Sequence, residues 1–231
     1  MKKLDNDKPL ILLGDHHGNW SELFYLIDKN KLENCYLISV GDLGIGFESK
    51  ERQLQTMTKL NHLFKENNIY FKGIRGNHDD PDYFKDVNYG LEYFELIEDY
   101  SVYEYNSKLI QFIGGAISID RTGRRLNVSY WQNEGLNFQK NKCKKVDVLI
   151  THTAPSFCFP QSFNEIVYGW AGEDEFLLKE LTQERKDMDK IFKICDPSWH
   201  FYGHFHSSTY EKINNCLHKL LNINELYEFK I

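Results

Sequence analysis

Residues 9–19 read PLILLGDHHGN, an apolar run that stops at a glycine followed by an aspartate and two histidines. The run has the length and composition of a buried strand. Residues 19–30 then place apolar side chains at three- and four-residue steps behind Asn19 or Ser21, either of which can cap a helix. This stretch predicts a strand, a polar turn and a helix.

Two further apolar runs repeat this unit. Residues 35–40 end at Gly41 and residues 69–74 end near Gly76, while residues 49–67 between them carry apolar side chains at helical spacing. Strands that alternate with helices in this way are typical of a parallel sheet with crossover helices.

The remainder of the chain has a different pattern. Residues 96–97, 101–105 and 109–113 are short strand-like runs between polar turns, as in antiparallel hairpins, and residues 174–194 have the pattern of a long amphipathic helix. Because no linker rich in proline, glycine and serine interrupts the chain, we expect one domain over residues 1–231. A mixed sheet, or two stacked sheets flanked by helices, fits this order of elements.

The composition excludes several classes of protein. The 231 residues are 41% hydrophobic, which is enough for one sizeable core, and the net charge of -6 disfavours a protein that grips duplex nucleic acid. The five cysteines are odd in number and widely spaced, which indicates neither a disulfide framework nor a thiolate zinc site. With no apolar run long enough for a signal peptide or a membrane span, we expect a cytoplasmic protein without membrane contact.

Polar clusters follow the predicted strands, and together they suggest a metal site. Ligands of open α/β sheets bind beyond the carboxyl ends of the strands, so these clusters can converge. Carboxylate oxygens and imidazole nitrogens suit Mn, Fe, Zn, Co or Ni. A single Gly-Asp turn or histidine is usually structural, but five clusters in order are hard to explain by chance. They contain Asp15, His16 and His17; Asp42; Asn77, His78 and Asp79; His152; and His204 and His206.

The ordered motifs GDHHGN, GD, GNHD, THTAP and GHFH, which run from Asp15 to His206, resemble those of the calcineurin-like metallophosphoesterase family. The resemblance implies a four-layer αββα sandwich with two mixed β-sheets and two divalent metal ions. Manganese is the first expectation, while iron, zinc, cobalt and nickel suit the same ligands. Carried over by position, one ion would take Asp15, His17, Asp42 and His206, and the other Asp42, Asn77, His152 and His204.

The resemblance also implies a reaction. Two ions about 3.5–4 Å apart can hold a bridging hydroxide that attacks a phosphomonoester or phosphodiester of a small molecule or nucleotide. Asp42 would bridge the ions, and His78 would protonate the leaving alkoxide. A nuclease or nucleic-acid phosphatase on the same scaffold is an alternative that the acidic charge disfavours. A non-catalytic interaction scaffold is a third possibility. It is disfavoured because a suitable residue stands at every ligand position of the motifs. The oligomeric state cannot be inferred.

The chain departs from one subgroup of this family, the phosphoprotein phosphatases, whose second motif is GD-x-VDRG. Here Ile45 and Gly46 stand where that subgroup has its second aspartate and its arginine. The departure weakens the prediction of a protein phosphatase. It also leaves open which residue orients His78, with Glu48 and Asp79 as candidates.

Several residues are tentative ligands for substrate. Arg75 stands where the same subgroup has a phosphate-clamping arginine. An equal alternative is that Arg75 is a solvated or salt-bridged arginine at the end of a strand. Arg121, Arg124 or Arg125 can hold a second phosphate and Trp131 can stack on a ring, but a surface hairpin with its own salt bridges is the favoured interpretation of this segment. The histidines outside the motifs, His62, His200 and His218, receive no role.

Overall fold

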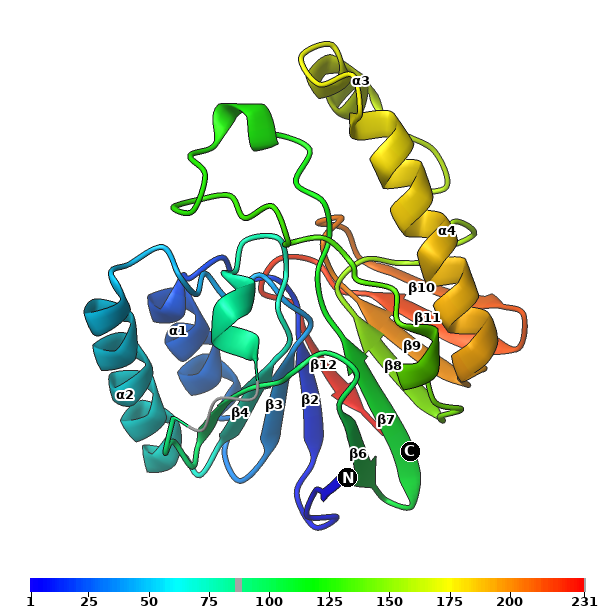
Figure 1. The fold of residues 1–231 in the computed structure, drawn as a ribbon. Helices are drawn as coiled ribbons and strands as arrows, with labels where there is room; N and C mark the ends of the chain where they lie inside the picture. The colour runs from blue at the N-terminus through cyan, green and yellow to red at the C-terminus, as the bar shows by residue number, and fades with distance from the viewer. Residues whose placement is uncertain (86–88, 231) are drawn as a thin grey trace.

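Two β-sheets packed face to face form the centre of the computed structural model, which describes residues 1–85 and 89–230 (Figure 1). The smaller sheet has the strand order β12-β2-β3-β4-β5. Its strands are parallel except β12, which runs antiparallel to β2. Their bounds are Leu10–Leu13 for β2, Tyr36–Ser39 for β3, Tyr70–Gly73 for β4, Phe94–Leu96 for β5 and Leu226–Phe229 for β12.

The larger sheet has the strand order β1-β6-β7-β8-β9-β11-β10. Its central strands β7, β8, β9 and β11 are parallel, while β6 and β10 pair antiparallel with their neighbours β7 and β11. The bounds are Lys2–Lys3 for β1, Val102–Tyr105 for β6, Lys108–Ile113 for β7, Val148–Thr151 for β8, Trp199–Tyr202 for β9, Thr209–Ile213 for β10 and Cys216–Leu220 for β11.

Apolar side chains fill the space on both faces of each sheet. In β2, Leu10 and Leu12 point into the core between the sheets, whereas Ile11 and Leu13 pack under the helices. A strand that is buried on both faces needs an uninterrupted apolar run, which is the pattern of residues 10–13.

Helices cover the outer faces of the two sheets. Helices α1 (Trp20–Asn30) and α2 (Lys50–Glu66) lie on the smaller sheet and α4 (Leu177–Cys195) on the larger, which confirms the four-layer αββα sandwich (Figure 1). The short helix α3 (Glu165–Ala171) precedes α4, and 3-10 turns occur at Pro81–Phe84, Arg121–Gly123 and Lys140–Lys142. Asn19 is the cap of α1, since its side chain accepts a hydrogen bond from the backbone N–H of Glu22.

One prediction about the middle of the chain was wrong. Residues 96–97 were expected in an antiparallel hairpin, but β5 pairs in parallel with β4. The antiparallel pairing expected for 101–105 and 109–113 is present between β6 and β7. Among the described residues, no helix is both long enough and apolar enough to cross a membrane.

Candidate metal centre

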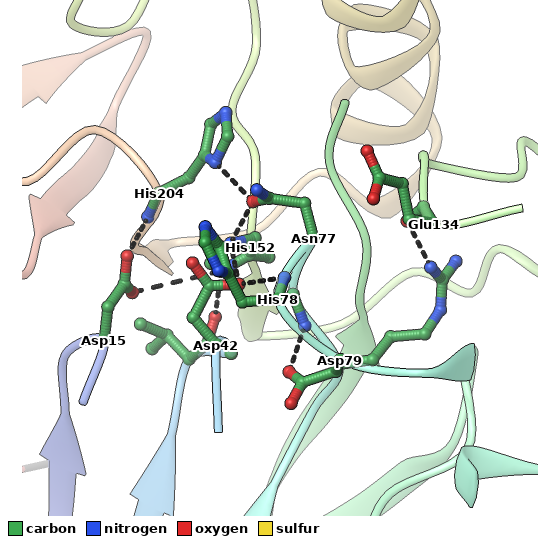
Figure 2. Close-up of polar contacts among 12 residues, drawn as sticks. Asp15, Asp42, Asn77, His78, Asp79, Glu134, His152 and His204 are labelled. Atoms are coloured by element: carbon green, nitrogen blue, oxygen red, sulfur yellow. Dashed lines mark hydrogen bonds and ion pairs between the residues drawn. The ribbon is translucent and has the colours of Figure 1, made fainter. Parts of the chain in front are cut away.

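The loops that follow β2, β3, β4, β8 and β9 bring their polar side chains to one place. Figure 2 shows Asp15, Asp42, Asn77, His152 and His204 facing a common space, with the strands β2 and β3 leading into it. Parallel strands end on the same edge, so each loop contributes from its own strand end. All of these side chains except that of His204 are almost fully buried.

The first predicted ligand set is compact. The ligand atoms of Asp15, His17, Asp42 and His206 all lie within 4.8 Å of one another. Nε2 of His206 is 3.0 Å from Nε2 of His17 and 3.4 Å from Oδ2 of Asp15. Nδ1 of His17 is 3.6 Å from Oδ2 of Asp42. Carboxylate and imidazole atoms at these separations can share one divalent cation.

The second predicted set is also brought together. Nε2 of His152 lies 3.2 Å from Oδ1 of Asp42 and 3.2 Å from Oδ1 of Asn77. Oδ1 of Asn77 is in turn 2.8 Å from Nδ1 of His204. Asp42 therefore faces the first set with Oδ2 and the second with Oδ1, which is the arrangement expected of a carboxylate shared by two cations.

Neighbouring groups fix the orientation of these ligands. Nδ1 of His152 donates to the carbonyl of Val40 at 2.8 Å, so Nε2 is the nitrogen that faces the centre. Nδ2 of Asn77 donates to Oγ of Ser118 at 3.1 Å, which turns Oδ1 toward the histidines. Both side chains are held in the orientation that a metal ligand needs.

The electrostatics of the centre favour positive charge. Burial disfavours a charged His152, but Asp42 and Asp15 raise the pKa of its imidazole to about 10. The hydrogen bond to Asp15 raises the pKa of His206 as well. Oδ1 of Asp15 is buried and accepts no hydrogen bond from the described residues. The donor set thus fits two divalent cations, since it has acceptor capacity and negative charge to spare.

Asp79 ties the two central loops together. Its Oδ2 accepts the backbone N–H groups of Leu43 and Gly76 at 3.0 and 2.8 Å, and its Oδ1 accepts that of Ile45 at 2.9 Å. Burial, assisted by the charge of Asp42, raises the pKa of this carboxyl to about 7. Asp79, a candidate for orienting His78, is instead bonded to backbone.

Two glycines allow the loops to approach this closely. A Cβ atom on Gly76 would lie 2.0 Å from Oδ1 of Asp42. A Cβ on Gly41 would lie 2.3 Å from Nδ1 of His152, and the φ angle of +119° at this residue also favours glycine. The glycines of the motifs therefore make room for the ligands themselves.

Comparison with known proteins agrees with this geometry. The family model described as calcineurin-like phosphoesterase matches residues 8–208. The chain belongs to the calcineurin-like phosphoesterase family. The chain has no significant match among curated proteins.

The solved structures that match share little sequence with this chain. One crystal structure has 11% identity and a TM-score of 0.54, with 96% of this chain and 98% of the other covered, and it supports the common fold. A conserved uncharacterized protein from Streptococcus pneumoniae TIGR4, described as a predicted phosphoesterase, has 14% identity, a TM-score of 0.35, and coverage of 94% and 72%. GAP50, the anchor in the inner membrane complex of Plasmodium, has 12% identity, a TM-score of 0.43, and coverage of 93% and 71%.

His78 lies at the edge of the candidate metal centre. Its backbone N–H donates to Oδ1 of Asp42 at 2.8 Å, and its ring lies against that of His17 with centroids 4.7 Å apart. Nε2 of His78 is 2.8 Å from Nη2 of Arg124, so this nitrogen accepts a hydrogen bond from the guanidinium. Burial lowers the pKa of His78 to about 4; Arg124 acts in the same direction and Asp42 opposes it.

Arg75 is held by groups other than the metal ligands. Its Nε and Nη2 contact Oδ2 of Asp99 at 3.0 and 2.9 Å, and Nη1 and Nη2 donate to the carbonyls of Glu134 and Gly135. With only 4% of the residue exposed, the guanidinium has no free face for a phosphate. The structure corrects the expectation of a phosphate clamp, and the salt-bridged alternative describes this arginine.

The tentative ligands in the 121–131 segment are also arranged differently from the prediction. Arg121 is paired with Asp174 at 2.5 Å and with Glu180, while Arg125 is exposed. Trp131 is 5% exposed and makes a T-shaped contact with Phe47, with the ring centroids 5.4 Å apart. The arginine that reaches His78 is Arg124, which Asp120 holds through Nε at 2.7 Å. The segment thus makes salt bridges, as in the favoured alternative, but it forms a 3-10 turn and irregular loop in place of a hairpin, and Arg121 pairs with residues outside it.

A pocket of about 400 Å³ opens beside the metal centre. Phe47, which is 43% exposed, stacks on His78 at 6.3 Å between ring centroids and forms part of its wall. Glu48, the other candidate for orienting His78, accepts a hydrogen bond from the hydroxyl of Thr56 in this wall. The remaining side chains that line the pocket are His17, Trp20, Gln53 and His78.

Proposed function

We propose that this chain is a metal-dependent phosphoric ester hydrolase that cleaves a phosphomonoester or phosphodiester of a small molecule or nucleotide. The observation that carries the proposal is the pair of ligand sets that share Asp42. Membership of the calcineurin-like phosphoesterase family supports the same class of chemistry.

The residues that would hold two divalent ions are those of the two ligand sets, with manganese the first candidate metal. When bound, such ions lower the pKa of a water molecule and neutralise the oxygens of the phosphate. The protein contributes rigid placement, since Val40, Ser118 and Asp79 hold the ligands or their loops in position.

His78 and Arg124 supply the other groups that the reaction needs. We assign to Arg124 the binding of a phosphate oxygen, because its guanidinium already reaches the edge of the metal centre. When Arg124 turns to the phosphate, Nε2 of His78 is released to carry a proton, and the added negative charge favours the protonated ring. His78 then donates this proton from Nε2 to the leaving alkoxide.

The pocket beside His78 suits a small leaving group. Its volume of about 400 Å³ lies within the usual range for small-molecule sites. Phe47 and Trp20 offer aromatic surface for a ring, whereas Glu48 adds negative charge where a polynucleotide would bring its own phosphates. A nucleotide or another small phosphate ester fits this wall better than a long nucleic acid.

The test is hydrolysis by metal-stripped protein that is reloaded with one divalent metal at a time. The substrates are p-nitrophenyl phosphate, bis-p-nitrophenyl phosphate, nucleoside phosphates, and single-stranded DNA and RNA. We expect metal-dependent cleavage of small esters that Asp42→Asn lowers roughly 1000-fold or more. Asp82→Asn, a change at an exposed aspartate, is the control that retains the activity.

The other outcomes point to different functions. Equal rates for the wild type and Asp42→Asn would refute metal-dependent hydrolysis at this centre. Preferential cleavage of single strands with a steep dependence on salt would identify a nuclease instead. If the protein binds no metal and hydrolyses none of the substrates, a non-catalytic scaffold is the remaining interpretation.

A further inference from the structure

A second group of metal-binding side chains lies away from the five motif loops. Cys158, His200 and His218 are fully buried, and their ligand atoms lie within 4.8 Å of one another. His200 is on β9, His218 is on the adjacent strand β11, and Cys158 is in the turn after β8. Phe192 of α4 packs on both imidazoles, so this Cys-His-His cluster lies between the larger sheet and α4.

We propose that Cys158, His200 and His218 form a structural site for one divalent cation that prefers thiolate and imidazole ligands, with zinc as the first candidate. Zinc binds cysteine sulfur together with histidine nitrogen in closed structural sites. This site is separate from the proposed two-metal centre, whose ligand atoms are oxygen and nitrogen only.

The hydrogen bonds around His200 fix its tautomer. The hydroxyl of Thr151 donates to the carbonyl of Thr153 at 2.5 Å, so its oxygen must accept at its other contact, which is Nε2 of His200 at 2.8 Å. Nε2 therefore carries the hydrogen, and Nδ1 presents its lone pair to the cluster. An outer hydrogen bond that orients the free nitrogen in this way is the usual support of a metal-binding histidine.

His218 cannot satisfy both of its close neighbours with a single hydrogen. Its Nδ1 lies 3.1 Å from Nδ1 of His200 and 3.1 Å from Sγ of Cys158. If Nδ1 carries a hydrogen, that hydrogen is shared between two acceptors; if it does not, two lone pairs of imidazole nitrogens face each other. A cation bound by all three atoms removes this conflict, and the thiol proton of Cys158 is released to solvent when the cation binds.

Glu211 is the candidate for a fourth ligand of suitable charge. Glu211 is the direct partner of His218 across β10 and β11, so the two side chains share a face of the sheet. Oε2 of Glu211 is buried and has no hydrogen-bond partner among the described residues. Arg185 donates to the carbonyls of Pro155 and Cys158 at 2.6 and 2.8 Å and holds the cysteine turn in place.

The spacing of the cysteines had indicated no thiolate zinc site, and His200 and His218 had no assigned role. Our proposal revises both, because residues far apart in the chain meet where β9 and β11 pair.

Cobalt titration of the metal-stripped full chain tests the proposal. A thiolate bound to Co²⁺ gives a charge-transfer band in the near ultraviolet, and the two-metal centre cannot produce it because none of its ligands is a cysteine. We expect the band in the wild type and in Asp42→Asn, and its loss in Cys158→Ser. Cys216→Ser, a change at another buried cysteine of the layer between this sheet and α4, is the matched control and keeps the band.

Two further measurements make the result decisive. Zinc-loaded wild type should show a sulfur neighbour at about 2.3 Å by X-ray absorption, and Cys158→Ser should not. If Cys158→Ser fails to fold, His218→Gln keeps the thiol and should still weaken cobalt binding at the thiolate site by at least about tenfold. No thiolate band in cobalt-saturated wild type, or an undiminished band in Cys158→Ser, would overturn the site. Because Asp42→Asn reports on the two-metal centre alone, failure here is distinct from failure of the proposed hydrolysis.

Discussion

Replacing Asp79 by alanine removes the acceptor that joins the loops after β3 and β4. The fully buried carboxyl accepts the backbone N–H groups of Leu43, Ile45 and Gly76. An unsatisfied buried donor costs about 1–3 kcal/mol, so Asp79→Ala should lower the free energy of unfolding by about 3 kcal/mol or more. A protonated carboxyl keeps its acceptor oxygens, so this magnitude holds for either charge state of Asp79.

A graded series sharpens the expectation. Asp79→Asn can keep one oxygen in place for Leu43 and Gly76, but its amide nitrogen then faces the N–H of Ile45, so its cost should be about 1–3 kcal/mol. Asp80→Ala is the control, because this neighbouring side chain accepts only an exposed N–H at the start of a 3-10 turn. Its cost should be about 1 kcal/mol or less.

Urea unfolding followed by circular dichroism measures the stabilities, and calorimetric titration with Mn²⁺ measures the consequence for the site. Because the two loops carry Asp42 and Asn77, Asp79→Ala should also weaken metal binding, while Asp80→Ala should not. If Asp79→Ala unfolds at the urea concentration of the wild type and binds metal equally well, other contacts hold the loops and our assignment is wrong.

Other variants test separate contacts. Arg124→Ala should lower kcat/KM for a phosphomonoester by about 10- to 100-fold, the worth of one charge-assisted hydrogen bond, while Arg125→Ala should leave it unchanged in steady-state assays. Gly76→Ala should weaken metal binding in calorimetry by about tenfold or more, since the new methyl group must displace the shared carboxylate. Although burial opposes its ionisation, contact with Lys72 helps to lower the pKa of Glu95 from 4.5 to about 2. Glu95 therefore ionises at a lower pH in the folded state than in the unfolded state. At neutral pH, Glu95→Gln should lower the free energy of unfolding by on the order of 3 kcal/mol at most. In urea unfolding, that difference should shrink as the pH falls from about 4.5 through 2.

The sequence predicted that the candidate metal ligands lie close together, and the reason is physical. Each ligand directly follows a buried strand, and parallel strands deliver the residues after them to one edge of the sheet. Asp15, Asp42 and His152 could thus be placed together from local pattern alone. The convergence seen in the structure needs no information beyond strand direction and order.

The orientation of the arginines was harder to predict because they lie where no regular element fixes their direction. Arg121, Arg124 and Arg125 differ by a few positions in an irregular segment, and which of them meets His78 depends on the path of that loop. Arg75 adjoins a motif, yet its orientation is set by Asp99 and by backbone far along the chain.

Long-range pairing explains the remaining differences. The parallel partner of β5 is chosen by packing against β4, which a short run such as 96–97 does not reveal. The Cys-His-His cluster was hidden for the same reason, since it depends on which strands of the larger sheet become neighbours.

The pairing of β12 has a consequence for folding during synthesis. It pairs with β2, and residues beside it bond to the turn that carries Asp15 through the contacts Gly14 N–H to Glu225 carbonyl and Asn224 N–H to Asp15 carbonyl. A ribosome produces every motif ligand before it reaches residue 224. The edge of β2, the strand that leads to the first ligand, therefore stays open until β12 has been made, and the turn that carries Asp15 gains these backbone contacts only then.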